Sequence, residues 1–312
     1  MNKNCIRYIT GLLLFGTNGF VASHIALSSG QIVLLRTGIG SIALLILFLF
    51  TGHHLGLRTM GKCDLLMTAG AGVALGMSWI LLFEAYRLIG VGTASLAYYC
   101  GPIIVVALSP VVFHEKLSTR AYICFALVIT GMLLTNLRKF AGPGFSVTSF
   151  RGLMLGIGAA FMYAVMMICS RKAADVEGFK RSTLQMVFAF LTVLVCMGII
   201  SRPVGPDAAG SAAAIFPVSL SECFWILVLG LVNTGVGCYL YFSSVSVLPV
   251  RTVSIVGYLE PLSAVIFSAV LLHEAFGISE AAGAVLIISG AMLMEKRSGE
   301  HSPKCLAKLS AG

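Results

Sequence analysis

Two stretches of the chain repeat one pattern of residues. The first, residues 91–117, reads VGTASLAYYCGPIIVVALSPVVFHEKL, and the second, residues 250–276, reads VRTVSIVGYLEPLSAVIFSAVLLHEAF. Aligned without gaps, the two share threonine, serine, tyrosine, proline and the dipeptide His-Glu at equal spacing. Unrelated apolar segments share some leucine and valine, but they do not share proline and His-Glu at fixed distances. We therefore infer an internal duplication.

The duplication extends well beyond these stretches. A shift of 159 residues aligns 76–134 with 235–293, and 17 of the 59 aligned positions are identical. Nearer the N-terminus, a shift of 141 residues aligns Phe20 with Phe161. The proline-containing loop around 202–220 accounts for the change of shift.

The composition excludes a water-soluble protein. Of the 312 residues, 58% are apolar and 11% are charged, whereas about 25% are charged in an ordinary soluble domain. The mean hydropathy is +0.97. These values exclude a soluble globular enzyme, a disordered chain and a secreted disulfide scaffold. Lipid must surround most of the chain, and in lipid each spanning segment is expected to be helical.

Ten apolar runs are long enough to cross a bilayer, which takes roughly 20 residues. The predicted spans are residues 6–24, 31–50, 64–86, 93–113, 119–137, 152–170, 182–201, 221–245, 250–272 and 278–295. We predict an all-α integral membrane protein of ten transmembrane helices. Because each copy of the repeat has five spans, an odd number, the second copy enters the membrane from the opposite side. The predicted fold is therefore an inverted five-plus-five repeat.

The distribution of lysine and arginine predicts the topology. With the N-terminus inside, the inner segments hold 15 of the 21 Lys and Arg residues, the outer segments hold 5, and Arg36 lies within a span. The positive-inside rule then places both termini in the cytoplasm of a multi-pass plasma-membrane protein. The formal charge of +9 reflects these basic residues between the spans and does not indicate a nucleic-acid partner. Val21-Ala22-Ser23 loosely resembles a signal-peptidase site, but we expect no cleavage because the segment has an internal counterpart.

The repeat also divides the chain into units. We assign the first five-helix repeat to residues 1–138 and an outer linker to 139–151. The second five-helix repeat takes residues 152–295, and a cytoplasmic tail takes 296–312.

Four short motifs connect the chain to a known family. They are Leu35-Arg36 in the second span, Thr93-Ala94-Ser95-Leu96 at the entry to the fourth, Pro102 followed by His114-Glu115-Lys116-Leu117, and Glu260-Pro261 followed by Leu272-His273-Glu274. Over about residues 6–295, the chain resembles an EamA-type member of the drug/metabolite transporter superfamily. The resemblance implies ten helices, an inverted five-plus-five repeat and, commonly, export of metabolites or amino acids.

Glu260 is the leading candidate for a substrate-binding residue. It lies about ten residues into the ninth predicted span, which places it about 15 Å deep at 1.5 Å per residue. Pro261 follows it, as Pro102 follows Gly101 in the first copy, and each proline is expected to break its helix. Transporters build their sites at broken helices in mid-membrane. The glutamate could bind a cation, an amine or a proton, or it could be a neutral residue hydrogen-bonded to a neighbouring helix.

Two further ionisable residues lie within spans. Arg36 and Glu84 are expected at similar depth toward the outer side, where a salt bridge between them could form an outer gate or an anion site. The alternative is that both side chains reach to the outer interface.

Polar and aromatic side chains at comparable depths could line a central cavity. Aromatic rings offer apolar surface and attract ligand amines, although each ring could equally be an ordinary helix contact. The candidates for substrate binding are Asn18, Trp79, Tyr98, Tyr99, Tyr163, Asn233 and Tyr258.

Other chemistry is excluded by missing motifs. Neither His114-Glu115 nor His273-Glu274 continues as H-E-x-x-H, so no zinc protease is predicted. Each of these glutamates precedes a helix, and capping of a helix N-terminus is the expected role. The chain has no G-x-x-x-x-G-K-[ST] loop, and its nine cysteines are scattered. We predict no metal, no cofactor and no ATPase.

These features predict a secondary transporter that works by alternating access. The expected cargo is a small amino-acid-like metabolite that is exported. Export is either coupled to protons or runs down the gradient of the metabolite itself. A drug or organic-cation exporter is the alternative. An intramembrane enzyme would need buried catalytic histidines, but the six histidines fall at span ends, in loops or in the tail. A passive scaffold or receptor would not explain an inverted repeat with unmatched central charges. The sequence makes no prediction of oligomeric state.

Overall fold

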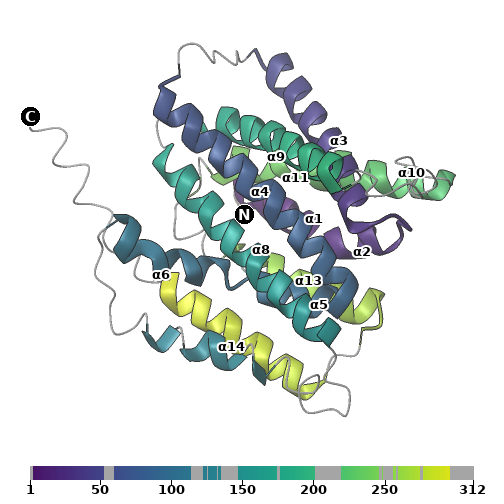
Figure 1. Ribbon diagram of the computed structural model, residues 1–312, viewed down its shortest axis with the longest axis vertical. Helices are drawn as coiled ribbons and strands as arrows, with labels where there is room; N and C mark the ends of the chain where they lie inside the picture. The colour runs from purple at the N-terminus through teal and green to yellow at the C-terminus, as the bar shows by residue number, and fades with distance from the viewer. Residues whose placement is uncertain are drawn as a thin grey trace, which may run out of the picture.

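A computed structural model of the chain shows an all-α membrane protein (Figure 1). It describes residues 3–52, 60–113, 122–124, 126–131, 133–134, 147–173, 176–200, 219–245, 248, 256–257, 259–274 and 277–295. All regular elements in these ranges are helices. Seven helices are long and apolar enough to cross a membrane.

The helices follow the predicted spans along the chain. In the first half they are α1 (Lys3–Gly16), α2 (Asn18–Ser23), α3 (Ser29–Phe50), α4 (Lys62–Ile89), α5 (Val91–Tyr98) and α6 (Gly101–Phe113). In the second half they are α8 (Val147–Lys172), α9 (Gly178–Ile200), α10 (Leu220–Leu227), the π-helix η3 (Val228–Val236), α11 (Gly237–Val245), α13 (Leu259–Leu271) and α14 (Ile278–Glu295). Shorter apolar helices cover Tyr122–Gly131, Leu262–Leu271 and Ala281–Gly290, within the predicted spans 119–137, 250–272 and 278–295.

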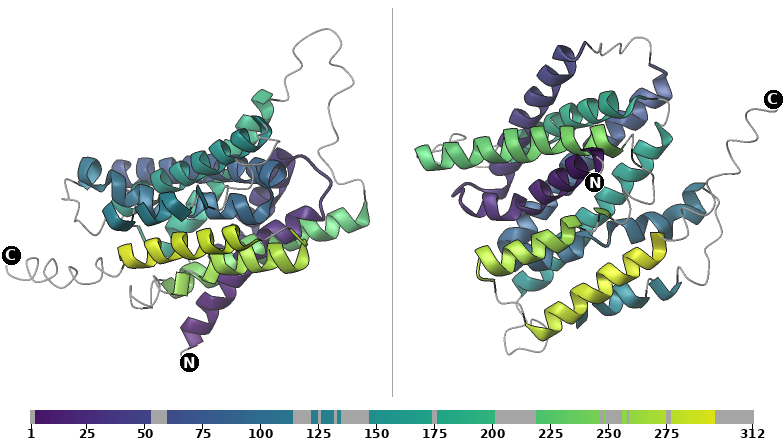
Figure 2. Two further views of the ribbon diagram at one scale, coloured as in Figure 1. Left: turned by 90° about the horizontal axis from the view of Figure 1, so that it is seen from below. Right: turned by 180° about the vertical axis from the view of Figure 1, so that it is seen from behind.

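Helices of the two halves interleave. Helix α4 packs against α8 and α9, which face the viewer together in Figure 1. Helix α1 packs against α11 and α13, and these lie on the opposite side of the molecule, as the right-hand view of Figure 2 shows. Helix α3 contacts α9 and η3, and α5 contacts α13. The interior of the bundle is therefore built from both halves.

Two predicted spans are interrupted in the middle. The first breaks at Thr17, whose backbone N–H is shared between the carbonyls of Leu13 and Leu14 at 3.2 Å each. The fourth breaks at Tyr99 and Cys100, between α5 and α6. Pro102 is the second residue of α6, a position where the missing N–H costs no helical hydrogen bond. Pro261 is likewise the third residue of α13.

Small residues bring the helices of the two halves close together. Gly131 and Gly290 are equivalent in the duplication. A Cβ atom added to Gly131 would lie 2.7 Å from the Gly283 carbonyl oxygen, and one added to Gly290 would lie 3.1 Å from the Cys124 carbonyl oxygen. Since Cys124 and Gly283 are also equivalent, the two close approaches are reciprocal. Such contacts are typical of membrane helices that pack through small residues.

Replacement of Gly72 by alanine should loosen the contact between α4 and α9. An added Cβ atom would lie 2.4 Å from the Phe188 Cβ and 2.7 Å from the Gln185 carbonyl oxygen. We expect a loss of roughly 1–3 kcal/mol of stability, because backbone and a packed side chain would have to move. The measurement is thermal unfolding in detergent. The control is Gly198→Ala on α9, where an added Cβ meets nothing within 4 Å. Equal melting temperatures for the two variants would contradict this packing.

Candidate functional site

A cavity of about 460 Å³ lies between the two halves. Seven of the residues singled out in the sequence line it, and they come from six helices and the break after α5. They are Asn18 of α2, Arg36 of α3, Trp79 of α4, Tyr98 of α5, Tyr99, Tyr163 of α8 and Glu260 of α13. The fold therefore brings most of the candidate residues together.

Arg36 is a buried cation that pairs with none of the acidic residues the structure describes. Its side chain is 2% exposed, and its Nε atom is buried with no hydrogen-bond partner among the described residues. The guanidinium carbon lies 4.3 Å from the centroid of the Trp79 ring and 5.1 Å from that of Phe83. The ring faces attract the cation, but they do not use its hydrogen-bond donors. The guanidinium is thus available to an anionic group in the cavity.

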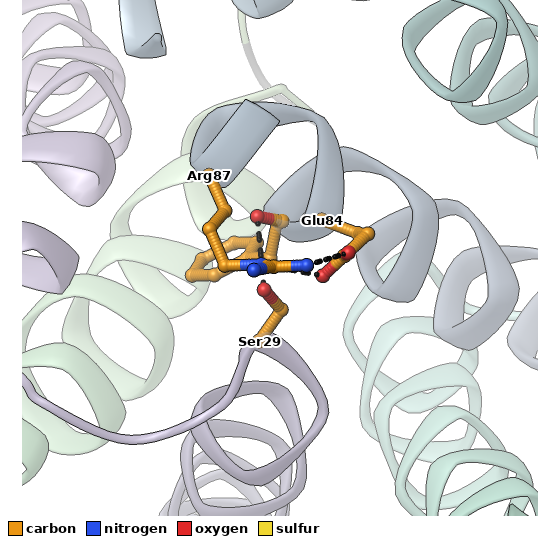
Figure 3. Close-up of polar contacts among 4 residues, drawn as sticks. Ser29, Glu84 and Arg87 are labelled. Carbon is orange, nitrogen blue, oxygen red and sulfur yellow. Dashed lines mark hydrogen bonds and ion pairs between the residues drawn. The ribbon is translucent and has the colours of Figure 1, made fainter. Parts of the chain in front are cut away.

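The predicted salt bridge between Arg36 and Glu84 is wrong. Glu84 pairs instead with Arg87, whose Nε donates to Oε2 at 3.2 Å (Figure 3). Side chains three residues apart lie on one helix surface, so Arg87 is the nearer cation. Ser29 anchors the same helix by donating its hydroxyl to the Phe83 carbonyl oxygen at 3.2 Å. Glu84 does not line the cavity and cannot form a gate with Arg36 in this arrangement.

Glu260 and Arg36 line the same cavity but do not form an ion pair. Tyr99 lies within electrostatic range of the Glu260 carboxyl group. Tyr86 and Tyr98 each lie within electrostatic range of both Arg36 and Glu260. No ion pair joins Arg36 to a described residue. One cavity therefore presents a cationic group and a carboxyl group that are separated by tyrosines.

Aromatic rings make up much of the cavity wall. The Tyr98 ring packs edge-on against Tyr99 and Tyr163, with centroids 5.7 and 5.3 Å apart. Ring pairs of this geometry hold one another in place. The wall combines apolar surface with several hydroxyl groups.

One predicted site residue, Asn233, lies outside the cavity lining. Asn233 of η3 is buried but does not line the cavity. Its amide donates to the Leu14 carbonyl oxygen and the Thr17 hydroxyl, both at 2.9 Å, and to Asn18 Oδ1 at 3.1 Å. It therefore holds the break between α1 and α2 and orients Asn18. Tyr258 lies outside the described residues.

Several lining residues were not predicted from the sequence. Tyr86 follows Trp79 by seven residues, so the helical period could have placed both on one face of α4. Gln185 donates its amide to the Ser170 hydroxyl at 2.6 Å, and both line the cavity. Arg171 and Arg181 line it as well, at the facing ends of α8 and α9. The cavity thus extends toward this end of the bundle.

The described residues contain no group of three or more His, Cys, Asp or Glu side chains that could hold a metal ion. The chemistry that the cavity offers is reversible binding through charge, hydrogen bonds and aromatic surface.

Comparisons with known proteins agree with this arrangement. The sequence model of the EamA-like transporter family matches residues 4–137 and 150–295. A curated relative, "Uncharacterized transporter YxxF" of Bacillus subtilis (strain 168), is 25% identical over 300 residues, which are 95% of this chain and 90% of the relative. A solved structure described as "Crystal structure of protein" has a TM-score of 0.63 at 20% identity, over 95% of this chain and 99% of that chain. This last likeness is one of fold.

Asn233→Ala should destabilise the protein, because the Thr17 hydroxyl and Asn18 would lose a buried donor. We expect a loss of about 1–3 kcal/mol for groups left unsatisfied in the interior. Thermal unfolding in detergent measures the effect. Thr10→Ala is the control, since that hydroxyl donates to a carbonyl oxygen on the exposed surface of α1. A melting temperature for Asn233→Ala equal to that of the control would contradict the structural role.

Proposed function

Because this chain belongs to the EamA-like transporter family, we propose that it is a secondary active transporter that exports a small amino-acid-like metabolite. Membership of this family makes the chain a multi-pass membrane transporter rather than an enzyme. Small-molecule substrate and lipid are accordingly its partners. The substrate class, the direction and the mechanism are argued below.

The observation that carries the proposal is the unpartnered Arg36 in the same cavity as Glu260. A guanidinium presents a fork of donors that matches a carboxylate. A carboxyl group can accept hydrogen bonds from an ammonium group. A small zwitterion with one group of each kind would satisfy both residues, and its remaining surface would lie against the tyrosines. A cavity of about 460 Å³ suits a molecule of this size.

An organic cation is the second candidate substrate. Tyr98, Tyr99 and Tyr163 line the cavity near Glu260, and ring faces and a carboxylate together attract cations. The buried charge of Arg36 opposes a second cation in the same space. We therefore rank the zwitterion first.

The contacts between helices support an inverted five-plus-five repeat of ten spans. Helix α8 is the repeat equivalent of α1, α4 corresponds to η3 and α11, and α6 corresponds to α13. Helix α1 contacts α11 and α13, and α8 contacts α4 and α6. This exchange of equivalent partners, with the reciprocal contacts of Gly131 and Gly290, is what a two-fold relation between the halves requires. Two related halves around one cavity favour alternating access.

The same reasoning extends to the topology. We propose repeats at residues 1–138 and 152–295, joined by an outer linker at 139–151, with a cytoplasmic tail at 296–312. Both termini then lie in the cytoplasm, and the protein lies in the plasma membrane. The arginines at the ends of α8 and α9 fall on the inner side of this arrangement.

Arg36→Gln should impair transport of zwitterions far more than Arg151→Gln. Protein in liposomes is loaded with unlabelled amino acids, and uptake of labelled L-amino acids by counterflow is measured. We expect Arg36→Gln to lower uptake at least about tenfold, because loss of one member of a buried charge pair costs about 2–5 kcal/mol. Arg151 of α8 is exposed and does not line the cavity, so Arg151→Gln is the matched control.

The same assay separates the two substrate classes. The organic-cation exporter would be favoured by two results together. The unaltered protein would take up no amino acids, and Arg36→Gln would increase uptake of a labelled quaternary amine. Turnover of a substrate without movement across the bilayer would contradict transport itself.

Glu260→Gln tests whether protons are co-substrates. The glutamine keeps the shape of the side chain but cannot exchange a proton. We expect a pH gradient to drive uptake by the unaltered protein and to have no effect on the variant. Uptake is measured at equal and unequal pH across the liposome membrane. A gradient response that persists in Glu260→Gln would remove this residue from proton coupling.

A further inference from the structure

A second cavity, of about 360 Å³, adjoins the central one. It lies at the end of the bundle where α4 ends and α5 begins, and Val91 and Leu272 belong to its lining. Phe83 and Tyr86 line both cavities. Their rings are 5.3 Å apart, and the Tyr86 hydroxyl lies 3.4 Å from the Ser95 hydroxyl. These two rings therefore belong to the wall that the two cavities share.

On its far side, the second cavity is bounded by a contact between the two halves. Glu274, which follows α13, accepts hydrogen bonds from the backbone N–H groups of Val91 at 2.7 Å and Gly92 at 3.0 Å. The Ser268 hydroxyl donates to the same carboxylate. The first N–H groups of a helix have no partner within it, and its positive end favours a negative charge. Glu274 thus caps α5, a helix of the other half, whereas the sequence suggested that it caps the helix that follows it.

Further contacts join the halves at the same end. Glu222 of α10 accepts a hydrogen bond from the Ala26 backbone N–H at 3.2 Å. The His24 ring stacks on Trp225 at 4.5 Å. The central cavity reaches instead toward Arg171 and Arg181, at the opposite ends of the spans. The structure is closed at one end by charge-assisted contacts between the halves, and its main cavity extends toward the other.

We propose that this closed end is the gate through which substrate leaves the central cavity. The inner barrier is the ring pair Phe83–Tyr86, the second cavity is the passage beyond it, and the Glu274 cap on α5 is the outer latch. The latch must release Val91 and Gly92 each time the transporter opens at this end. This inference rests on the proposed transport function, and it assigns a role to Glu274 that binding in the central cavity does not need.

A disulfide across the latch tests the proposal. A Cβ atom added to Gly92 would lie 3.5 Å from the Ser268 Cβ, which is within the range of a disulfide. The double variant Gly92→Cys/Ser268→Cys is made in a protein whose native cysteines are replaced by alanine. Mass spectrometry measures disulfide formation. Equilibrium dialysis measures binding of labelled L-amino acids, and counterflow measures transport. The single variants Gly92→Cys and Ser268→Cys are the controls, and oxidant should leave their rates unchanged.

We expect the oxidised double variant to bind labelled amino acids but to transport them at least tenfold more slowly, with recovery on reduction. A complete disulfide with transport within twofold of the reduced form would overturn the gate, because the contact would then stay closed throughout the cycle. Failure of the disulfide to form would overturn it as well, since the contact itself would be absent.

Amide hydrogen exchange tests the gate without the need for a substrate. If the reduced protein neither binds nor transports amino acids, the proposed substrate class fails, and the gate is then judged by exchange at residues 91 and 92. A latch that opens should exchange these amides at least tenfold faster in the reduced double variant than in the oxidised one. Equal rates would overturn the gate whatever the substrate is.

Discussion

The structure depends on a guanidinium that is held inside the bundle without an acidic partner among the residues described. Arg36 lies on α3, and the rings over which it sits, Trp79 and Phe83, lie on α4. A cation in this position is tolerated only if its surroundings compensate for lost water. The aromatic faces do so in part. Water or an anionic ligand in the adjoining cavity replaces the rest of the hydration that the guanidinium has lost. The position of α3 against α4 and the character of the cavity are therefore consequences of one charge.

The cavity needs both halves of the chain. Arg36, Tyr98 and Tyr99 come from the first half, whereas Glu260 and Tyr163 come from the second. Close packing through Gly72 and Gly131 holds the halves together along the walls. Capping of α5 by Glu274 holds them together at one end. Small residues and shape make the contacts along the walls, whereas charge and hydrogen bonds make the contacts at the closed end.

The sequence predicted an all-α membrane fold and many of the cavity residues, but not the pairing of side chains. Composition and length locate apolar spans, and the duplication identified Glu260 as a residue that is not repeated. Depth along a span was enough to group it with Tyr98 and Tyr163. Depth does not define the direction in which a side chain points, and for this reason Arg36 and Glu84 were wrongly paired. The cap made by Glu274 joins residues about 180 positions apart, and no local pattern indicates which helix it reaches.

The π-helix η3 introduces a difference between the two copies. Its nine residues correspond by the shift of 159 to residues 69–77, which lie in the uninterrupted helix α4. A π-helix widens the turn, and here Asn233 within it reaches the break in the first span. If the halves were identical, the two end states of the proposed cycle would be related by a two-fold rotation and equal in free energy. The widened turn is one of the differences between the copies that remove this equality, so the proposed cycle has a preferred resting conformation even with equal solutions on both sides and no cargo bound.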